Sequence, residues 1–132
     1  MIQFLLDTHV WLWLQATPQR IPQGMREELA DEENELLLSA ASSWEISIKY
    51  ALGKLPLPEP PRMYVPDRMR RSGTVGLAVE HGHALAVADL PQLHGDPFDR
   101  VLIVQAQSLG LTFVTADAQL AEYDIKLKLI DS

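Results

Sequence analysis

Short apolar runs alternate along this chain with stretches of helical periodicity, and this alternation limits its possible folds more than any other feature. Residues 2–6 form a continuous apolar run of the kind found in strands buried on both faces. Residues 35–39, 74–77 and 111–115 are also predicted strands. Parallel strands need crossover connections, which the intervening helices supply. The sequence therefore predicts an α/β fold, a three-layer α/β/α sandwich with a mainly parallel sheet.

Helical periodicity and its stop signals place six helices among these strands. The Pro-rich stretch LPLPEPP at 55–61 is expected to be a loop, and Gly110 is suited to ending the last helix. Residues 125–130 should form an edge strand with its lysines outward. A chain of 132 residues has room for one core, so we expect a single domain over 1–132. The predicted helices are 8–15, 22–33, 40–54, 62–72, 79–89 and 98–109.

The composition indicates which chemistry and which cellular compartment suit this chain. The chain has no cysteine, which excludes disulfides, thiol nucleophiles and cysteine-based zinc sites, and this fits a reducing cytoplasm. The apolar N-terminus lacks a basic leader and is interrupted by Asp7 and His9, so we expect it to be folded structure. No apolar run approaches the roughly 20 residues that cross a bilayer, so no membrane association is expected.

The net charge of -7 argues against a protein that binds nucleic acid by long-range attraction over its whole surface. This objection weakens if the acids gather where they bind cations and if basic side chains form a separate patch. The alternative for these basic side chains is a solvated helix face. The candidates for the patch are Arg62, Arg68, Arg70 and Arg71.

Two aspartates follow predicted strands directly. Asp7 ends the first apolar run, and Asp117 follows the strand LTFVT. In open α/β sheets, functional groups gather beyond the carboxyl ends of the strands, which is where both should lie. The alternative for each is an N-cap, because aspartate is favoured where a loop enters a helix.

The segment Asp96-Pro97-Phe98-Asp99 could be a complete helix start. Asp96 is suited to the cap and Pro97 to the first helical position. Capping explains Asp99 less fully, although the helix dipole favours an acid in the first turn.

Glu45 is the most informative single residue. Helical geometry places it beside an apolar stripe, so it should be at least half buried. The alternative is an i,i+4 ion pair with Lys49, worth only about 0.2–0.5 kcal/mol. The expected stripe consists of Ala41, Trp44, Ile48, Leu52 and Leu55.

Together these positions place three or four carboxylates at one crevice, where repulsion would raise their pKa values unless a cation neutralises them. Oxygen ligands without cysteine suit Mg²⁺ or Mn²⁺ better than zinc. Such ions activate water and stabilise a leaving oxygen, so hydrolysis of a nucleic acid backbone is the chemistry this pattern favours. Thr115 could orient the water, although threonine at a strand end is ordinary.

The histidines and tryptophans are weaker signals. His81 and His83 point in different directions on a helix, and they and His9 are expected to be structural. His94 could contact substrate or a phosphate, with a loop hydrogen bond as the alternative. The tryptophans Trp11, Trp13 and Trp44 are expected in the core, and any exposed one could belong to a protein interface.

Four stretches carry a family resemblance: LLDTHVWLW, SAASSWEISIKYALGKL, HGDPFDRVLIVQA and TFVTAD. In this order they resemble PIN-domain proteins, specifically the toxins of VapBC-type toxin–antitoxin pairs. The resemblance implies a Rossmann-like fold, Mg²⁺- or Mn²⁺-dependent endoribonuclease activity, homodimerisation and inhibition by a small cognate antitoxin. Carried over by position, the family's acids fall on Asp7, Glu45, Asp99 and Asp117. Asp96 matches an extra aspartate whose role, metal ligand or cap, stays open.

Two other functions fit the same residues. One is a catalytically weak interaction module that keeps the fold and binds a partner protein or RNA. The other is a metal-dependent phosphatase acting on small phosphoesters. Metal binding separates the enzyme from the module, and turnover of an aryl phosphate would identify the phosphatase.

Overall fold

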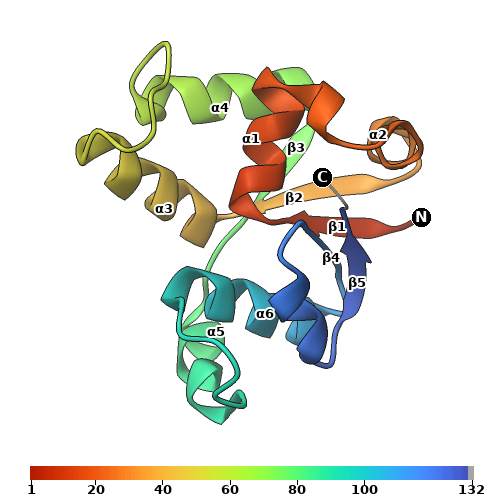
Figure 1. Ribbon diagram of the computed structural model, residues 1–132, viewed down its shortest axis with the longest axis vertical. Helices are drawn as coiled ribbons and strands as arrows, with labels where there is room; N and C mark the ends of the chain where they lie inside the picture. Colours follow the sequence, from red (N-terminus) through yellow and green to blue (C-terminus); the bar gives the residue numbers. More distant parts are fainter. Residues whose placement is uncertain (131–132) are drawn as a thin grey trace.

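Within the described residues, five strands pair side by side in the order β3-β2-β1-β4-β5, and every pairing is parallel. The computed structural model describes residues 1–130 (Figure 1). The strands are β1 (Gln3–Leu6), β2 (Glu35–Ser39), β3 (Thr74–Leu77), β4 (Thr112–Thr115) and β5 (Lys126–Leu129). The predicted parallel sheet is confirmed, and β5 is an edge strand as predicted, with Lys126 and Lys128 exposed.

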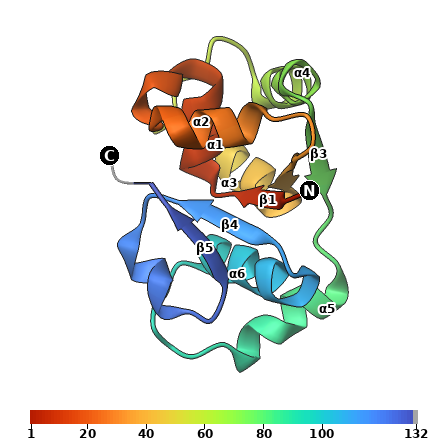
Figure 2. The same ribbon diagram turned by 90° about the vertical axis from the view of Figure 1, so that its right-hand side faces the viewer.

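Helices cover both faces of this sheet, as Figures 1 and 2 show. One face carries α1 (Thr8–Ala16), a 3-10 turn η1 (Pro18–Arg20), α2 (Gln23–Ala30) and α4 (Pro61–Ser72). The other carries α5 (His81–Ala86), η2 (Val87–Asp89), α6 (Pro97–Leu109) and η3 (Ala118–Glu122). Helix α3 (Ala40–Ala51) continues directly from β2. The α/β/α sandwich predicted from the strand and helix alternation is therefore confirmed.

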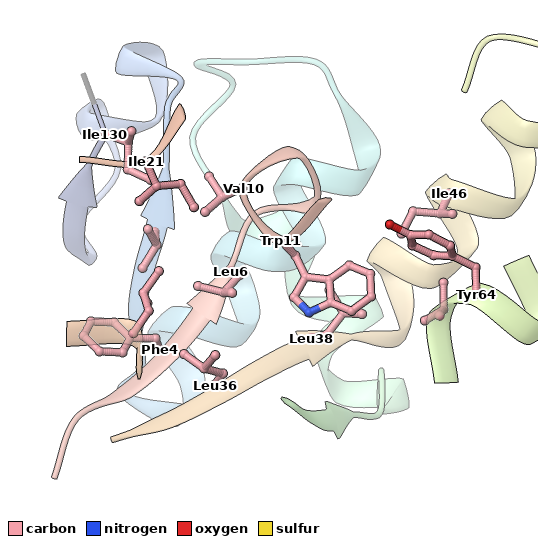
Figure 3. Packing of buried hydrophobic residues seen from close by; sticks show 13 residues of the cluster. Phe4, Leu6, Val10, Trp11, Ile21, Leu36, Leu38, Ile46, Tyr64 and Ile130 are labelled. Carbon is pink, nitrogen blue, oxygen red and sulfur yellow. The ribbon is translucent and has the colours of Figure 1, made fainter. Parts of the chain in front are cut away.

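Alternate residues of the central strand divide the core into two parts. Phe4 and Leu6 pack with α1 and α4, whereas Leu5 packs with α6, because successive strand side chains point to opposite faces. Trp11 is fully buried at the centre of the first part, beside Leu6 and Leu38 (Figure 3). Its indole Nε1 donates to Thr74 Oγ1 at 3.1 Å, so the polar edge of the ring is satisfied.

Two helices end earlier than the sequence predicted, and both ends have a local cause. Helix α2 ends at Ala30 because Asp31 forms a turn in which its Oδ1 accepts from Glu33 N at 2.9 Å. Helix α3 ends at Ala51 because Gly53 adopts a φ of 72°, a left-handed conformation that ends helices.

The predicted helix at 79–89 is in fact the short α5 followed by the 3-10 turn η2. Of the other predicted elements, β2 and β3 have the predicted bounds, and α1, α4 and α6 differ from theirs by one residue. Among the described residues, no helix is both long and apolar enough to cross a membrane.

Candidate active site

The site is built where the central strand β1 and its neighbour β4 end. β1 and β4 pair in parallel with Leu6 opposite Val114, so the residues that follow them lie at one edge of the sheet. Asp7 N donates to Val114 O at 2.9 Å, which extends the pairing to the aspartate itself. Thr115, the last residue of β4, is fully buried at this edge.

Asp7 and Glu45 form the buried part of the site, called here the inner pair; they are 7% and 3% exposed. Asp7 accepts from Thr115 Oγ1 at 2.7 Å through Oδ2 and from Thr8 N at 2.8 Å through Oδ1. Glu45 accepts from Thr8 Oγ1 at 2.8 Å through Oε1 and from Lys49 Nζ at 2.5 Å through Oε2. Each oxygen of the inner pair therefore has a protein donor.

His94, Asp99 and Asp117 form the more open part of the site, called here the outer trio. His94 Nε2 lies 2.8 Å from Asp99 Oδ2. Each residue of the trio offers one atom able to bind a metal ion, and these atoms lie within 4.8 Å of one another. The trio is the one group of three such residues found together in the described part of the chain.

Burial and like charge both perturb the acids. Burial raises the pKa of Asp7, and the hydrogen bond from Thr115 acts in the opposite direction. Burial and then the negative charge of Asp7 raise the pKa of Asp99 to about 7, against the hydrogen bond from His94. The repulsion expected from the sequence is present, but removal from water is the larger cause. A cation at this site would relieve both effects.

The capping roles considered for the aspartates are present as well. Asp7 Oδ1 accepts from Thr8 N, Asp96 Oδ1 accepts from Phe98 N at 2.9 Å, and Asp117 Oδ1 accepts from Gln119 N at 3.0 Å. Each cap occupies one oxygen of its carboxylate. Capping is therefore compatible with metal binding at Asp96 and Asp117, whereas at Asp7 the second oxygen already accepts from Thr115. The i,i+4 pair of Glu45 with Lys49 also exists.

The expected apolar stripe of α3 is wrong in two places. Trp44 and Leu52 are each 63% exposed, whereas the buried side of the helix includes Ala41, Glu45 and Ile46. Glu45 therefore lies within the buried face rather than beside it. The helix tolerates a buried acid there because Thr8 and Lys49 provide its hydrogen bonds.

Of the three tryptophans, only Trp11 is fully buried as predicted. Trp13 is partly buried, with the Arg20 guanidinium 4.1 Å from its ring centre. Trp44 is not in the core: its ring meets Phe98 edge to face, with centroids 5.1 Å apart. This aromatic pair immediately precedes Glu45 and Asp99 in the sequence.

Two further expectations from the sequence concern His83 and the arginines of α4. His83 Nδ1 accepts from Glu80 N at 3.0 Å, which confirms its structural role. In α4, three of the four candidate arginines pair with an acid of the same helix, so the basic patch that was one alternative for them is partly neutralised. The carboxylate of Asp67 pairs with Arg68, Arg70 and Arg71.

The sequence did not predict three residues of the site: Thr8, Ser42 and Arg100. Thr8 links Asp7 to Glu45, and its Oγ1 also lies 2.9 Å from Ser42 Oγ. Arg100, only 6% exposed, donates to backbone carbonyls of the 87–94 segment and so fixes the loop that carries His94. The sequence does contain a signal for these residues, because they are polar at helical positions that face inward. The neighbouring acids were the stronger candidates, so this signal was overlooked.

Comparison with known proteins gives concordant results. The model of the PIN domain family matches residues 4–126. Ribonuclease VapC16 of Mycobacterium tuberculosis is 53% identical over 76 residues, which are 52% of this chain and 54% of that protein. The match therefore spans about half of that relative. Ribonuclease VapC22 of the same organism is 29% identical over 123 residues, 93% of each chain.

Solved structures show the same fold at low identity. VapBC2 from Rickettsia felis, bound to a DNA fragment from its promoter, has a TM-score of 0.75 and 15% identity over 98% of this chain and 100% of that chain. FitAcB from Neisseria gonorrhoeae has a TM-score of 0.61 and 19% identity over 94% and 95% of the two chains. These likenesses concern the arrangement of the sheet and helices alone.

Proposed function

This chain belongs to the PIN domain family, and from that premise we propose that it is a metal-dependent endoribonuclease, the toxin of a toxin–antitoxin pair. The observation that carries the proposal is the proximity of acids from four parts of the fold. Asp7 lies close enough to Glu45 and Asp99 for their charges to interact, and Asp99 and Asp117 offer ligand atoms within 4.8 Å of each other. Two of its relatives are named as ribonucleases. The family match covers 4–126, and we propose that 1–132 acts as one PIN domain.

The donor set fits Mg²⁺ or Mn²⁺, because both ions favour carboxylate oxygens. We propose Asp7, Glu45, Asp99 and Asp117 as the ligands and catalytic acids, with Asp96 as a further candidate. When bound, such an ion supplies positive charge that polarises a phosphodiester and activates water. Thr115 positions Asp7 through the 2.7 Å hydrogen bond, which is a more specific role than the water contact expected from the sequence.

The surroundings of the acids favour single-stranded RNA as the substrate. Trp44 is exposed and packs against Phe98, and each precedes a proposed metal ligand. An unpaired base stacked on Trp44 would leave its phosphate close to the acids, and such stacking is worth about 1–3 kcal/mol per base. Stacking does not depend on net charge, so it lessens the objection raised by the acidity of the chain.

Regulation by a small antitoxin is the remaining part of the proposal. The acid site would attract basic side chains, so an antitoxin that inserts such a group would block the metal position. We further propose that the toxin acts in the cytoplasm as a homodimer. The VapBC-type resemblance of the sequence is the ground for the cytoplasm and the homodimer, and the likeness to VapBC2 supports only the antitoxin partner.

The test is cleavage of a single-stranded RNA pool by protein purified free of antitoxin, with Mg²⁺ or Mn²⁺. Asp99→Asn keeps the size of the side chain and should lower cleavage by at least about 100-fold, since the ligand charge is lost. Glu32→Gln removes one exposed charge before the start of β2, at the opposite edge of the parallel sheet, and should cleave like the wild type. Failure of the wild type to cleave with either ion, or equal cleavage by Asp99→Asn, would overturn the proposal.

One observation favours the interaction module as a second candidate. Lys49 already neutralises Glu45, so the inner pair is stable without a metal ion. Calorimetry separates the two functions: micromolar Mn²⁺ binding that disappears in Glu45→Gln supports the enzyme. Absence of Mn²⁺ binding by the wild type supports the module.

A further inference from the structure

His94 is a nitrogen donor placed among carboxylates. Its Nε2 lies 2.8 Å from Asp99 Oδ2, and both side chains are 15% exposed. With Asp117 these residues offer three ligand atoms within 4.8 Å of one another. The trio comes from three separate segments: the loop before α6, the first turn of α6, and the turn after β4.

The loop that carries His94 is fixed by a buried side chain. Arg100 Nη1 donates to His94 O at 3.1 Å and to Pro91 O at 2.9 Å, and its Nη2 donates to Val87 O at 3.0 Å. Arg100 belongs to the same helix as Asp99. The imidazole and the carboxylate are therefore held on one rigid unit, as a pre-organised ligand set requires.

We propose that His94 binds the metal ion directly through Nε2, together with Asp99 and Asp117, and that this nitrogen ligand makes the site prefer Mn²⁺ over Mg²⁺. The inference rests on the metal dependence in the proposed function and adds a ligand and a selectivity to it. Mg²⁺ is selective for oxygen ligands and retains its waters, whereas transition-metal ions accept imidazole.

The distances fit one ion. Ligands about 2.0–2.2 Å from an ion are separated by at most about 4.4 Å, when they lie on opposite sides of it. The 2.8 Å between His94 Nε2 and Asp99 Oδ2 suits neighbouring positions, and the 4.8 Å limit of the trio needs only small side-chain adjustments. The imidazole binds in its neutral form, with the proton on Nδ1.

The competing role for His94 is to orient Asp99 by a hydrogen bond without touching the ion, a common arrangement around ligating carboxylates. Loss of affinity on substitution would not separate the two roles. Direct coordination differs in one observable, because a nitrogen bound to Mn²⁺ gives a hyperfine coupling to the electron spin of the ion.

The experiment is pulsed electron paramagnetic resonance of the Mn²⁺-loaded, full-length protein without RNA. The wild type should show an imidazole nitrogen coupling that is lost in His94→Gln and kept in His9→Gln, which replaces a histidine close to Asp7. By calorimetry, His94→Gln should weaken Mn²⁺ binding about tenfold or more and Mg²⁺ binding by less than about threefold. Wild-type protein labelled with ¹⁵N-histidine should show the altered coupling of that isotope, and this measurement needs no variant.

A wild-type signal without nitrogen coupling, a coupling that persists in His94→Gln, or no Mn²⁺ binding would overturn the inference. Equal weakening of Mn²⁺ and Mg²⁺ binding in His94→Gln would overturn the selectivity. If the coupling is present and RNA is not cleaved, the ribonuclease proposal fails while His94 remains a ligand. If RNA is cleaved and no coupling is seen, only the role of His94 fails.

Discussion

The inner pair and the outer trio both contain carboxylates removed from water, but the two parts of the site differ in the hydrogen-bond donors that reach those carboxylates. In the inner pair, hydroxyl, amide and ammonium donors reach each carboxylate oxygen, so two deeply buried acids are stable in the metal-free chain. In the outer trio, the nearest partner of Asp99 is one imidazole, and its pKa rises to about 7. Burial raises the pKa of Asp7 as well, so the difference lies in the protein donors: each oxygen of the inner pair has one, whereas Asp99 has one imidazole and more to gain from a cation.

Replacing Thr115 with valine tests the inner pair most severely. Thr115→Val keeps the shape but removes the donor to Asp7 and the acceptor for Asp117 N. We expect the free energy of unfolding to fall by about 2–3 kcal/mol, as for buried hydrogen bonds to charged groups. Thr115→Ser keeps the hydroxyl and should lose less than about 1 kcal/mol. Urea unfolding measures both, and equal stability of the two variants would show that the hydrogen bond has no such role.

Lys49 donates to Glu45 of the inner pair, and a metal ion that binds Glu45 Oε2 would have to displace this lysine. Lys49→Gln should make the metal-free protein less stable and, because nothing then competes for Glu45 Oε2, tighten Mn²⁺ binding roughly tenfold. Lys54→Gln, which removes an exposed lysine beyond the same helix, serves as the control for net charge. Weaker Mn²⁺ binding in Lys49→Gln would contradict the competition.

The outer trio predicts a pH dependence of stability. The pKa of Asp99 is raised from 3.8 to about 7, so its contribution favours the folded state below pH 3.8 and is lost as the pH rises through about 7. Metal-free protein should therefore lose stability between these values, and Mn²⁺ should stabilise it more at high pH than at low pH. Asp99→Asn should flatten the metal-free dependence. Urea unfolding with chelator measures the free energy of unfolding of both proteins across this pH range. The same slope of this free energy against pH in the two proteins would contradict the prediction.

The smallest effect is expected at Asp96, whose two candidate roles are helix cap and metal ligand. Asp96→Ala removes the acceptor for Phe98 N and should cost about 1 kcal/mol of stability, whereas asparagine caps nearly as well as aspartate. If Asp96 acts only as a cap, Asp96→Asn should cleave RNA at the wild-type rate. A loss of about tenfold or more would assign Asp96 to the metal.

The sequence predicted the sheet and the location of the acids because both follow from local patterns. Apolar runs marked the strands, and acids directly after a strand in a parallel sheet can only lie at its carboxyl edge. The burial of Glu45 also followed from helical periodicity. Whether these acids bind a metal ion stays a prediction.

Contacts between distant segments were not predictable in the same way. The link from Thr8 to Glu45 and the clamp of Arg100 depend on how α1, α3 and α6 pack. Trp44 was placed in the core because tryptophan is usually buried, but its helix turns Glu45 inward instead. Hydrophobicity alone could not show that hydrogen bonds from Thr8 and Lys49 would stabilise the acid there.

The hydrogen bond from Thr115 to Asp7 joins residues 108 positions apart in the chain. Contacts of such separation form only after the intervening chain has been synthesised. A nascent chain on the ribosome that ends before β4 has Asp7, Glu45 and Asp99 but lacks both Thr115 and Asp117. The order of synthesis therefore delays completion of the site until almost the whole protein exists, and products of premature termination before β4 carry only part of it.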